Sequence, residues 1–207
     1  GRGYTDNPKY IHQEMLRQAR FDDYKMVWPV KKPKQTSIER AVVIRYNSLR
    51  YFYYMCKAKY WIVNCKLPKH IQKKDSQVYL QTWHGTPLKR LAHDIVEVEN
   101  QTFYRSGMSR QQMTNTYDDD VAKYNYMIAP NPFSFEVFQS AFRINPERLI
   151  KTGYPRNDLL SDPHKEEIAK ELETKRFTFK VNSGAEGRVF GSVSTKQIVE
   201  ELHKNGY

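Results

Sequence analysis

Short apolar segments alternate with helix-like segments along most of this sequence, and this alternation constrains the fold more than any other feature. Five segments have the length and composition of buried strands: residues 24–30, 60–64, 78–83, 124–130 and 148–153. Helical spacing or helix-start residues mark four others: residues 7–19, 38–58 (capped by Ser37), 131–142 and 162–175 (capped by Asp162). The pattern predicts an α/β fold, a parallel sheet with helices on both faces. None of the strands alternates strictly, as expected for strands that are buried on both sides.

The ends of the predicted strands indicate where a ligand would bind. His84, Asn131 and Gly153 each lie at or directly after the end of a predicted strand. In a parallel sheet, ligands bind beyond the carboxyl ends of the strands. We therefore expect these three loops to meet at one edge of the sheet and to form the site there.

The stretch "VYLQTWHGTPLKRL", residues 78–91, carries the most specific chemistry. His84 is expected at the strand end, with Gly85 allowing a sharp turn and Pro87 beginning a helix at Leu88. The amino end of that helix, with Lys89 and Arg90, would favour an anion. This pattern is typical of a histidine that acts as acid or base beside a phosphate. The alternative is a strand-end histidine that only hydrogen-bonds a loop carbonyl.

Charge is concentrated in the first part of the chain. Residues 1–93 carry 19 Lys and Arg against 6 Asp and Glu, whereas residues 94–175 carry 10 against 14. So basic a segment favours polyanionic partners: nucleic acid, phosphorylated substrates or an anionic lipid surface. A solvated basic face without a partner is the alternative.

The remaining composition narrows the class of protein. The two cysteines, Cys56 and Cys65, predict free thiols in a reducing compartment, and neither has the spacing of a zinc site. No apolar run has the length of a membrane span, and no signal peptide is visible. The sequence neither starts with Met nor ends on an obvious terminating element, so we expect a fragment.

Residues 45–61, "RYNSLRYFYYMCKAKYW", interleave cations with aromatic residues. Three interpretations stay open. The segment could contact anionic lipid head groups with its aromatic residues at the interface. It could bind nucleic acid by stacking and phosphate contacts. It could also be an ordinary helix whose aromatic face packs on the sheet.

Four segments together resemble a known family. They are "GRGYTDNPKYIHQEM", "YLQTWHGTPLKRLAHDI", "YNYMIAPNPFSFEVFQSAF" and "RLIKTGYPRNDLL". Over residues 1–174 the chain resembles the bacterial CDP-glycerol glycerophosphotransferases, the teichoic acid primases and polymerases. The resemblance implies a glycosyltransferase-B architecture, two Rossmann-like domains facing a cleft, attached peripherally to the cytoplasmic face of the membrane. It also implies transfer of glycerol phosphate from CDP-glycerol to a lipid-linked polyol-phosphate acceptor, with release of CMP. CDP-ribitol remains open as the donor.

The resemblance assigns candidate roles to individual residues. His84 matches the family's proposed base on the acceptor hydroxyl. We assign phosphate or acceptor contacts to Gly85, Thr86, Lys89 and Arg90, and a place near the cleft to Arg156, Asn157 and Asp158. We expect no tightly bound cofactor and assign no metal ligands.

The family's second domain, with a further histidine and the cytidine diphosphate pocket, has no counterpart in this sequence. We therefore expect residues 1–174 to be the acceptor-side, Rossmann-like half of the enzyme. This half should be inactive without the missing nucleotide-binding domain.

The tail differs from the rest of the chain. Residues 177–203 resemble the start of the C-terminal domain of the ninth large-subunit ribosomal protein of bacteria. That resemblance implies ribosomal RNA contacts by the glycine-rich loop and its cations: Gly184, Gly187, Arg188, Gly191 and Lys196. We expect residues 175–207 to be a short α+β segment that joins the chain at a fusion or assembly junction. The alternative function for the whole chain is ribosomal RNA binding.

Overall fold

The computed structural model describes residues 3–96, 107–161 and 174 of the 207-residue chain. The chain divides into two compact units, residues 1–159 and residues 160–207. Nearly all described residues belong to the first unit. The predicted helix over residues 162–175 falls almost wholly outside them, as does the predicted tail segment.

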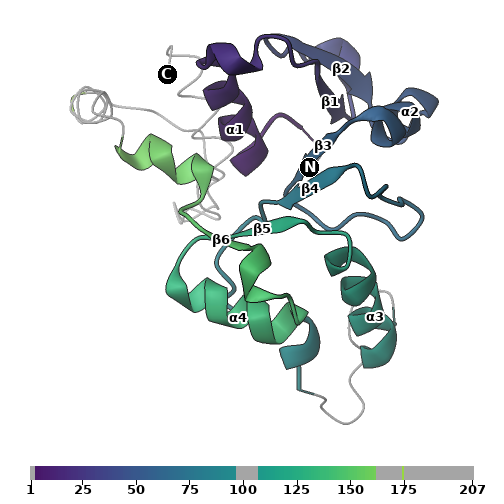
Figure 1. The fold of residues 1–207 in the computed structure, drawn as a ribbon, viewed down its shortest axis with the longest axis vertical. Helices are drawn as coiled ribbons and strands as arrows, with labels where there is room; N and C mark the ends of the chain where they lie inside the picture. The colour runs from purple at the N-terminus through teal and green to yellow at the C-terminus, as the bar shows by residue number, and fades with distance from the viewer. Residues whose placement is uncertain (1–2, 97–106, 162–173, 175–207) are drawn as a thin grey trace, which may run out of the picture. The chain divides into compact units, whose positions relative to one another are not determined.

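Six parallel strands form two sheets in the described part of the chain (Figure 1). The strands are β1 (Met26–Val30), β2 (Ala41–Arg45), β3 (Tyr60–Val63), β4 (Val78–Gln81), β5 (Tyr126–Ala129) and β6 (Leu149–Lys151). The first sheet pairs β1 with β2, and the second has the order β3-β4-β5-β6. Because the four strands of the second sheet are parallel and in sequence order, their carboxyl ends share one edge.

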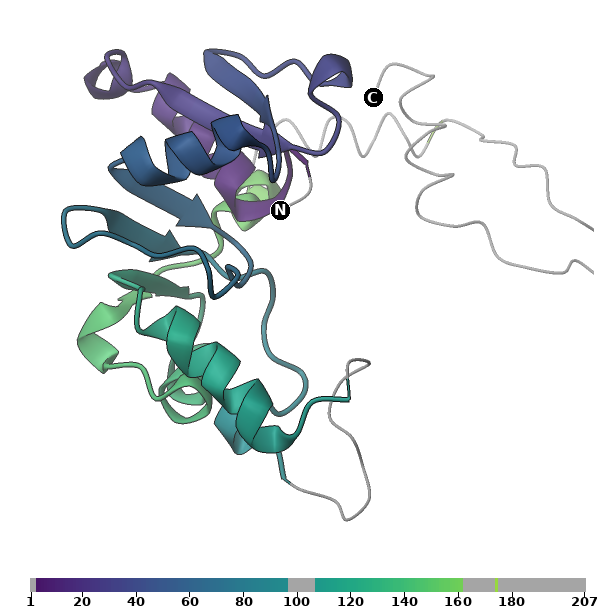
Figure 2. The same cartoon turned by 90° about the vertical axis from the view of Figure 1, so that its right-hand side faces the viewer.

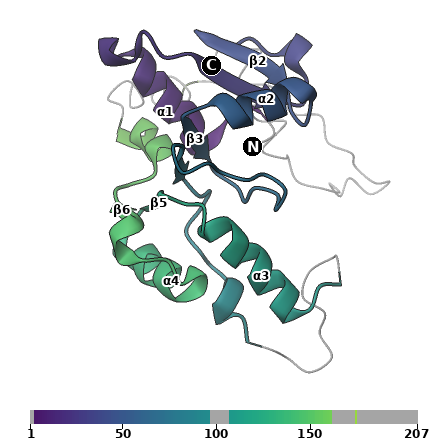
Figure 3. The ribbon, with the colours of Figure 1, turned by 45° about the vertical axis from the view of Figure 1, so that its right-hand side comes forward.

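Four α-helices flank the strands. They are α1 (Asp6–Leu16), α2 (Leu49–Lys57), α3 (Arg110–Val121) and α4 (Pro132–Phe142). Short 3-10 turns lie at Ala19–Phe21, Pro33–Gln35, Ala92–Asp94, Pro146–Arg148 and Pro155–Ser161. In all three ribbon views α1 and α2 lie toward β1 and β2, whereas α3 and α4 lie on the β5 side of the larger sheet (Figures 1, 2 and 3).

The predicted α/β class with parallel strands and flanking helices is confirmed. Each of the five predicted strands forms, although every one is shorter than expected. The helix expected over residues 7–19 forms as α1, and the one over residues 131–142 forms as α4. Asn131 caps α4, because its side-chain oxygen accepts a hydrogen bond from the backbone N–H of Ser134 at 2.8 Å.

The single long helix predicted over residues 38–58 is wrong. Its first part is β2, which pairs in parallel with β1, and its second part is α2. Asn47, with φ of 58°, interrupts the chain between them. Ser48 then caps α2 by accepting a hydrogen bond from the backbone N–H of Tyr51. The segment "AVVIR" is β-branched and apolar, so pairing with β1 stabilises it as a strand.

The chain between β4 and β5 differs from the prediction in two ways. No helix begins at Leu88; residues 85–91 form a loop, so the predicted helix amino end beside His84 is absent there. In contrast, α3 was not predicted. Ser109 and Gln112 form a reciprocal capping box at its start.

The core lies between the larger sheet and the helices beside it. Tyr79 of β4, Met127 of β5 and Phe138 of α4 are fully buried. Tyr51 of α2 and Trp61 of β3 belong to the same cluster. The sheet that positions the strand-end loops is thereby rigidly packed on aromatic side chains.

Candidate functional site

His84 stands three residues beyond the end of β4 and is exposed. Its Nδ1 lies 2.8 Å from the backbone carbonyl oxygen of Asn64, which directly follows β3. A carbonyl oxygen can only accept, so Nδ1 carries the hydrogen and donates it. In the neutral ring, Nε2 therefore holds the lone pair. The structure thus contains the carbonyl contact of the simpler interpretation, and that contact leaves the other nitrogen free to act as a base.

Backbone strain and packing fix the position of His84. The preceding residue, Trp83, has φ of 53°, a left-handed conformation that costs a bulky residue about 1–2 kcal/mol. Its N–H donates to the side-chain oxygen of Gln81 at 3.0 Å. The Trp83 ring packs on Phe142 at 5.1 Å and stacks against the His84 ring at 4.4 Å between centroids. Strain of this kind is typical of functional sites, where the surroundings over-determine the backbone.

The rationale given for Gly85 is therefore wrong. Its φ is not in the left-handed region, and a Cβ atom added there would meet nothing within 4 Å. The residue that turns the chain is Trp83, one position before the histidine.

Arg156 joins His84 to the start of the chain. Its Nη1 donates to the backbone carbonyl of His84 at 3.1 Å and to Asp6 Oδ1 at 2.6 Å. Asp6 Oδ2 in turn accepts from the side-chain amide of Asn64 at 2.6 Å. Asp6 thus links Arg156 to Asn64, the residue whose carbonyl orients the histidine.

Asn7 hydrogen-bonds both to the segment that precedes His84 and to Arg156. Its side-chain amide donates to the carbonyls of Thr82 and Trp83, at 3.2 and 3.1 Å. Its side-chain oxygen accepts from the backbone N–H of Arg156 at 3.3 Å. Asn7 is completely buried, so these bonds satisfy a side chain that would otherwise be costly to bury.

Tyr154 supports Arg156 from the core side. Its ring centroid lies 5.2 Å from the guanidinium carbon of Arg156, within range of a cation–π contact. Burial raises the pKa of Tyr154 to about 12, although the nearby Arg156 charge acts in the opposite direction. The phenol therefore remains neutral at physiological pH.

The other predicted site residues lie around this network without joining it. Thr86, Lys89 and Arg90 are exposed on the loop after His84. Asn157 and Asp158 are also exposed; the Asn157 N–H donates to the Tyr154 carbonyl at 2.8 Å. Of the three residues 156–158, the structure brings only Arg156 into contact with the histidine.

Asp6, Asn7 and Asn64 were missed as site residues. Asn64 could have been found, because it follows a strand just as His84 does. Asp6 and Asn7 carried only the signal of a helix start. Their partners lie 58 to 150 residues away in sequence, and no local pattern reveals contacts at that separation.

Two findings bear on the other predictions for the described residues. No group of three His, Cys, Asp or Glu side chains there could hold a metal ion. No helix within those residues is long and apolar enough to cross a membrane. The tail residues proposed to contact RNA, from Gly184 to Lys196, lie outside the described part of the chain.

The end of the chain, residues 164–207, matches the family model of the ribosomal protein L9 C-terminal domain. The large ribosomal subunit protein bL9 of Halothermothrix orenii is 51% identical over 41 residues, 20% of this chain and 28% of that protein. The predicted resemblance of the tail is confirmed.

The main comparisons concern the part of the chain that carries His84. The family model for CDP-glycerol:poly(glycerophosphate) glycerophosphotransferase matches residues 1–179. The teichoic acid poly(glycerol phosphate) polymerase of Staphylococcus epidermidis is 37% identical over 161 residues, 77% of this chain and 21% of that protein. The same-named polymerase of Bacillus spizizenii is 36% identical over 169 residues, 81% of this chain and 41% of that protein.

A solved structure of the wall teichoic acid polymerase TagF superimposes with a TM-score of 0.74 at 35% identity, covering 84% of this chain and 42% of that chain. Another structure of that polymerase is of a variant soaked with CDPG. This likeness supports the glycosyltransferase-B assignment of the fold. The chain spans less than half the length of these relatives. Matched over most of its residues by sequence and by fold, the chain belongs to the CDP-glycerol:poly(glycerophosphate) glycerophosphotransferase family.

Proposed function

We propose that this chain supplies the acceptor side of a glycerophosphotransferase and that His84 is its general base. The observation that carries the proposal is the 2.8 Å hydrogen bond from Nδ1 to the Asn64 carbonyl. It holds the ring in one tautomer and leaves Nε2 as the basic nitrogen on an exposed side chain. A histidine in that state can accept the proton of an acceptor hydroxyl.

The proposed reaction follows from this placement. Nε2 takes the hydroxyl proton while the acceptor oxygen bonds to the glycerol-bearing phosphorus of CDP-glycerol. The bond from that phosphorus to the oxygen bridging the two phosphates breaks, and CMP leaves. The acceptor is a lipid-linked polyol phosphate. Thr86, Lys89 and Arg90 are the candidates for phosphate contacts, whereas Arg156 is a positioning residue because Asp6 and the His84 carbonyl already engage its guanidinium.

The 207 residues alone are proposed to be inactive toward CDP-glycerol. They match 42% of the solved polymerase chain and 21–41% of the curated polymerases quoted above. Sites for the cytidine diphosphate are expected in the part of the family that lies beyond this match. We also propose that the acceptor-side domain ends at residue 174 and that the ribosomal-protein-like tail segment begins at residue 175.

We also propose that α2 touches an anionic membrane surface at the cytoplasmic face. Leu49 is 89% exposed and Tyr53 is 58% exposed, and they lie four residues apart on one helix face. Arg50 and Lys57 of the same helix are exposed cations. Exposed apolar side chains beside cations fit a peripheral contact with anionic lipid.

The test of the catalytic proposal uses a chimera in which residues 1–161 replace the matched segment of the Staphylococcus epidermidis polymerase. CMP release from CDP-glycerol is measured with a lipid-linked acceptor. His84→Ala should lower the rate by about 10²–10⁴-fold, the usual contribution of a general base. The 207-residue chain by itself, not fused to the polymerase, should release no CMP.

His70→Ala is the matched control, because His70 is exposed on the loop between β3 and β4. It should leave CMP release unchanged. Full activity of the His84→Ala chimera would refute the assignment of the base, and CMP release by the unjoined chain would refute its proposed inactivity.

A further inference from the structure

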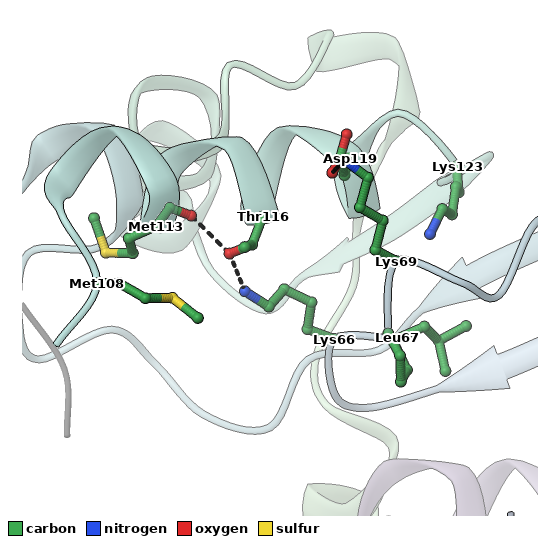
Figure 4. Close-up of a pocket in the computed structure, with 9 residues that line it drawn as sticks. Lys66, Leu67, Lys69, Met108, Met113, Thr116, Asp119 and Lys123 are labelled. Atoms are coloured by element: carbon green, nitrogen blue, oxygen red, sulfur yellow. Dashed lines mark hydrogen bonds and ion pairs between the residues drawn. The ribbon is translucent and has the colours of Figure 1, made fainter. Parts of the chain in front are cut away.

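A cavity of about 260 Å³ lies between α3 and the first residues of the loop that follows β3 (Figure 4). Lys66 and Lys69 reach toward α3 from the loop, and Lys123 follows the end of the helix. Met108 and Met113 form an apolar part of the wall. The cavity therefore combines ammonium groups with an apolar surface.

Two of the three ammonium groups have partners. Lys66 Nζ donates to Thr116 Oγ1 at 2.6 Å and lies 4.0 Å from the centroid of the Tyr117 ring. Lys69 Nζ pairs with Asp119 Oδ2 at 3.2 Å. Thr116 and the Tyr117 ring carry no formal charge. Asp119 pairs with Lys69, and the charge of Asp120 acts on both Lys66 and Lys123, so these two carboxylates stand against three ammonium groups.

Lys123 is different. Its Nζ is buried and has no hydrogen-bond partner among the described residues. The Asp120 carboxylate lies nearby and its charge acts on Lys123. Its Oδ2 accepts from the Tyr124 hydroxyl at 2.6 Å and from the Leu67 N–H at 3.3 Å, whereas its Oδ1 is buried without a hydrogen-bond partner among the described residues. A buried ammonium without a partner is costly, and an anion in the cavity would remove that cost.

The position of the cavity connects it to the histidine. Lys66 is two residues beyond Asn64, whose carbonyl orients His84. The segment from Asn64 to Lys69 thus contacts the proposed base through Asn64 and lines the cavity through Lys66 and Lys69. A long acceptor that presents its terminal hydroxyl to His84 could extend along this segment.

We propose that the cavity binds a phosphodiester of the acceptor chain, behind the hydroxyl that His84 deprotonates. The proposal rests on the proposed function and adds to it a second contact with the acceptor. The polymer named in the family description, poly(glycerophosphate), alternates phosphates with three-carbon units. Its phosphate suits Lys66 and Lys123, and its carbon unit suits the methionine wall.

Binding is tested on the full chain with the methyl groups of its methionines labelled for NMR. The probes are the diester of phosphate with two glycerols and, separately, inorganic phosphate. The diester should shift the Met108 and Met113 signals saturably and leave those of Met15 unchanged. Lys123→Met, which keeps the apolar stem and removes the charge, should weaken this binding about tenfold.

Lys57→Met is the control, because Lys57 is exposed on α2 and does not line the cavity; its binding should equal that of the unsubstituted chain. If Lys123→Met fails to fold, Lys66→Met takes its place with the same expected loss. Three outcomes would overturn the proposal. The diester could fail to shift the Met108 and Met113 signals saturably, or Lys123→Met and Lys66→Met could both bind the diester as tightly as the unsubstituted chain does. The third outcome is that only inorganic phosphate, and not the diester, saturates these signals.

A further variant separates this inference from the catalytic one. His84→Asn should bind the diester as the unsubstituted chain does, because binding in the cavity needs no base. Loss of CMP release in His84→Ala without any diester binding would refute the cavity alone. Diester binding together with full activity of His84→Ala would refute the base alone.

Discussion

At the residue scale, the position of His84 depends on the guanidinium of Arg156. Arg156 Nη1 reaches both Asp6 Oδ1 and the His84 carbonyl, so one planar group fastens loops from the two ends of the unit. The Asp6 carboxylate extends the same network to Asn64. A lysine has one compact ammonium in place of the planar fork, and it would not reproduce this geometry.

Arg156→Lys should therefore lower the free energy of unfolding by about 1.5 kcal/mol, the lower end of what hydrogen bonds to charged groups contribute. In the chimera it should lower kcat while leaving KM for CDP-glycerol unchanged, because a positioning residue orients the base without binding donor. Urea unfolding and steady-state kinetics measure the two effects. Arg45→Lys, at an exposed position, is the control. Unchanged stability and kcat would mean that the network does not hold His84.

The position of Arg156 near the site could be predicted from the sequence, but its role could not. The resemblance marked it only as part of a motif. Asp6 lies 150 residues away, and a hydrogen bond at that separation depends on the packing of the whole unit. His84 was predictable because a strand-end residue is placed by its own neighbours in sequence.

At the scale of elements, the strands were the predictable part. Strands buried in a parallel sheet are short apolar runs, and all five predicted runs form strands. α3 was missed because most of its residues are polar and its buried apolar residues are few: Met113, Tyr117 and Val121. β2 and α2 were merged because no Gly or Pro separates them in sequence, whereas Asn47 takes a left-handed conformation that ends the strand.

α3 should depend strongly on its cap because so little of it is apolar. Ser109→Ala removes the side chain that accepts from the Gln112 N–H and should cost about 1 kcal/mol of unfolding free energy. The same change should loosen one wall of the lysine-lined cavity. Urea denaturation followed by circular dichroism measures the loss. Ser76→Ala, at an exposed loop position, should have no effect; an equal loss in both variants would contradict the role of the cap.

At the scale of the whole molecule, charge and exposed apolar side chains point to a surface partner. Residues 1–93 carry most of the excess of Lys and Arg, and α2 lies within them. The aromatic stretch, residues 45–61, divides into buried and exposed side chains. Tyr51 and Trp61 are buried in the core, while Leu49 and Tyr53 remain exposed. The exposed pair is what a lipid contact would use.

Sedimentation with lipid vesicles tests that contact. The chain should bind vesicles containing phosphatidylglycerol and not purely zwitterionic ones, and binding should weaken as salt rises because charges are screened. Replacing both Leu49 and Tyr53 by Ser should weaken binding by about tenfold or more, given the apolar area each would bury. Phe133→Ser removes an exposed aromatic residue of α4 and serves as the control. Equal binding by the α2 variant and the control would refute the contact.

The group that orients His84 belongs to the main chain, and this has a consequence for how the site tolerates mutation. Replacing Asn64 by Ala deletes its amide hydrogen bond to Asp6 but leaves its backbone carbonyl oxygen in place. The imidazole thus keeps its acceptor through every single substitution at position 64 that preserves the backbone. Substitution at that position should change the stiffness of the site before it changes which nitrogen of His84 carries the hydrogen.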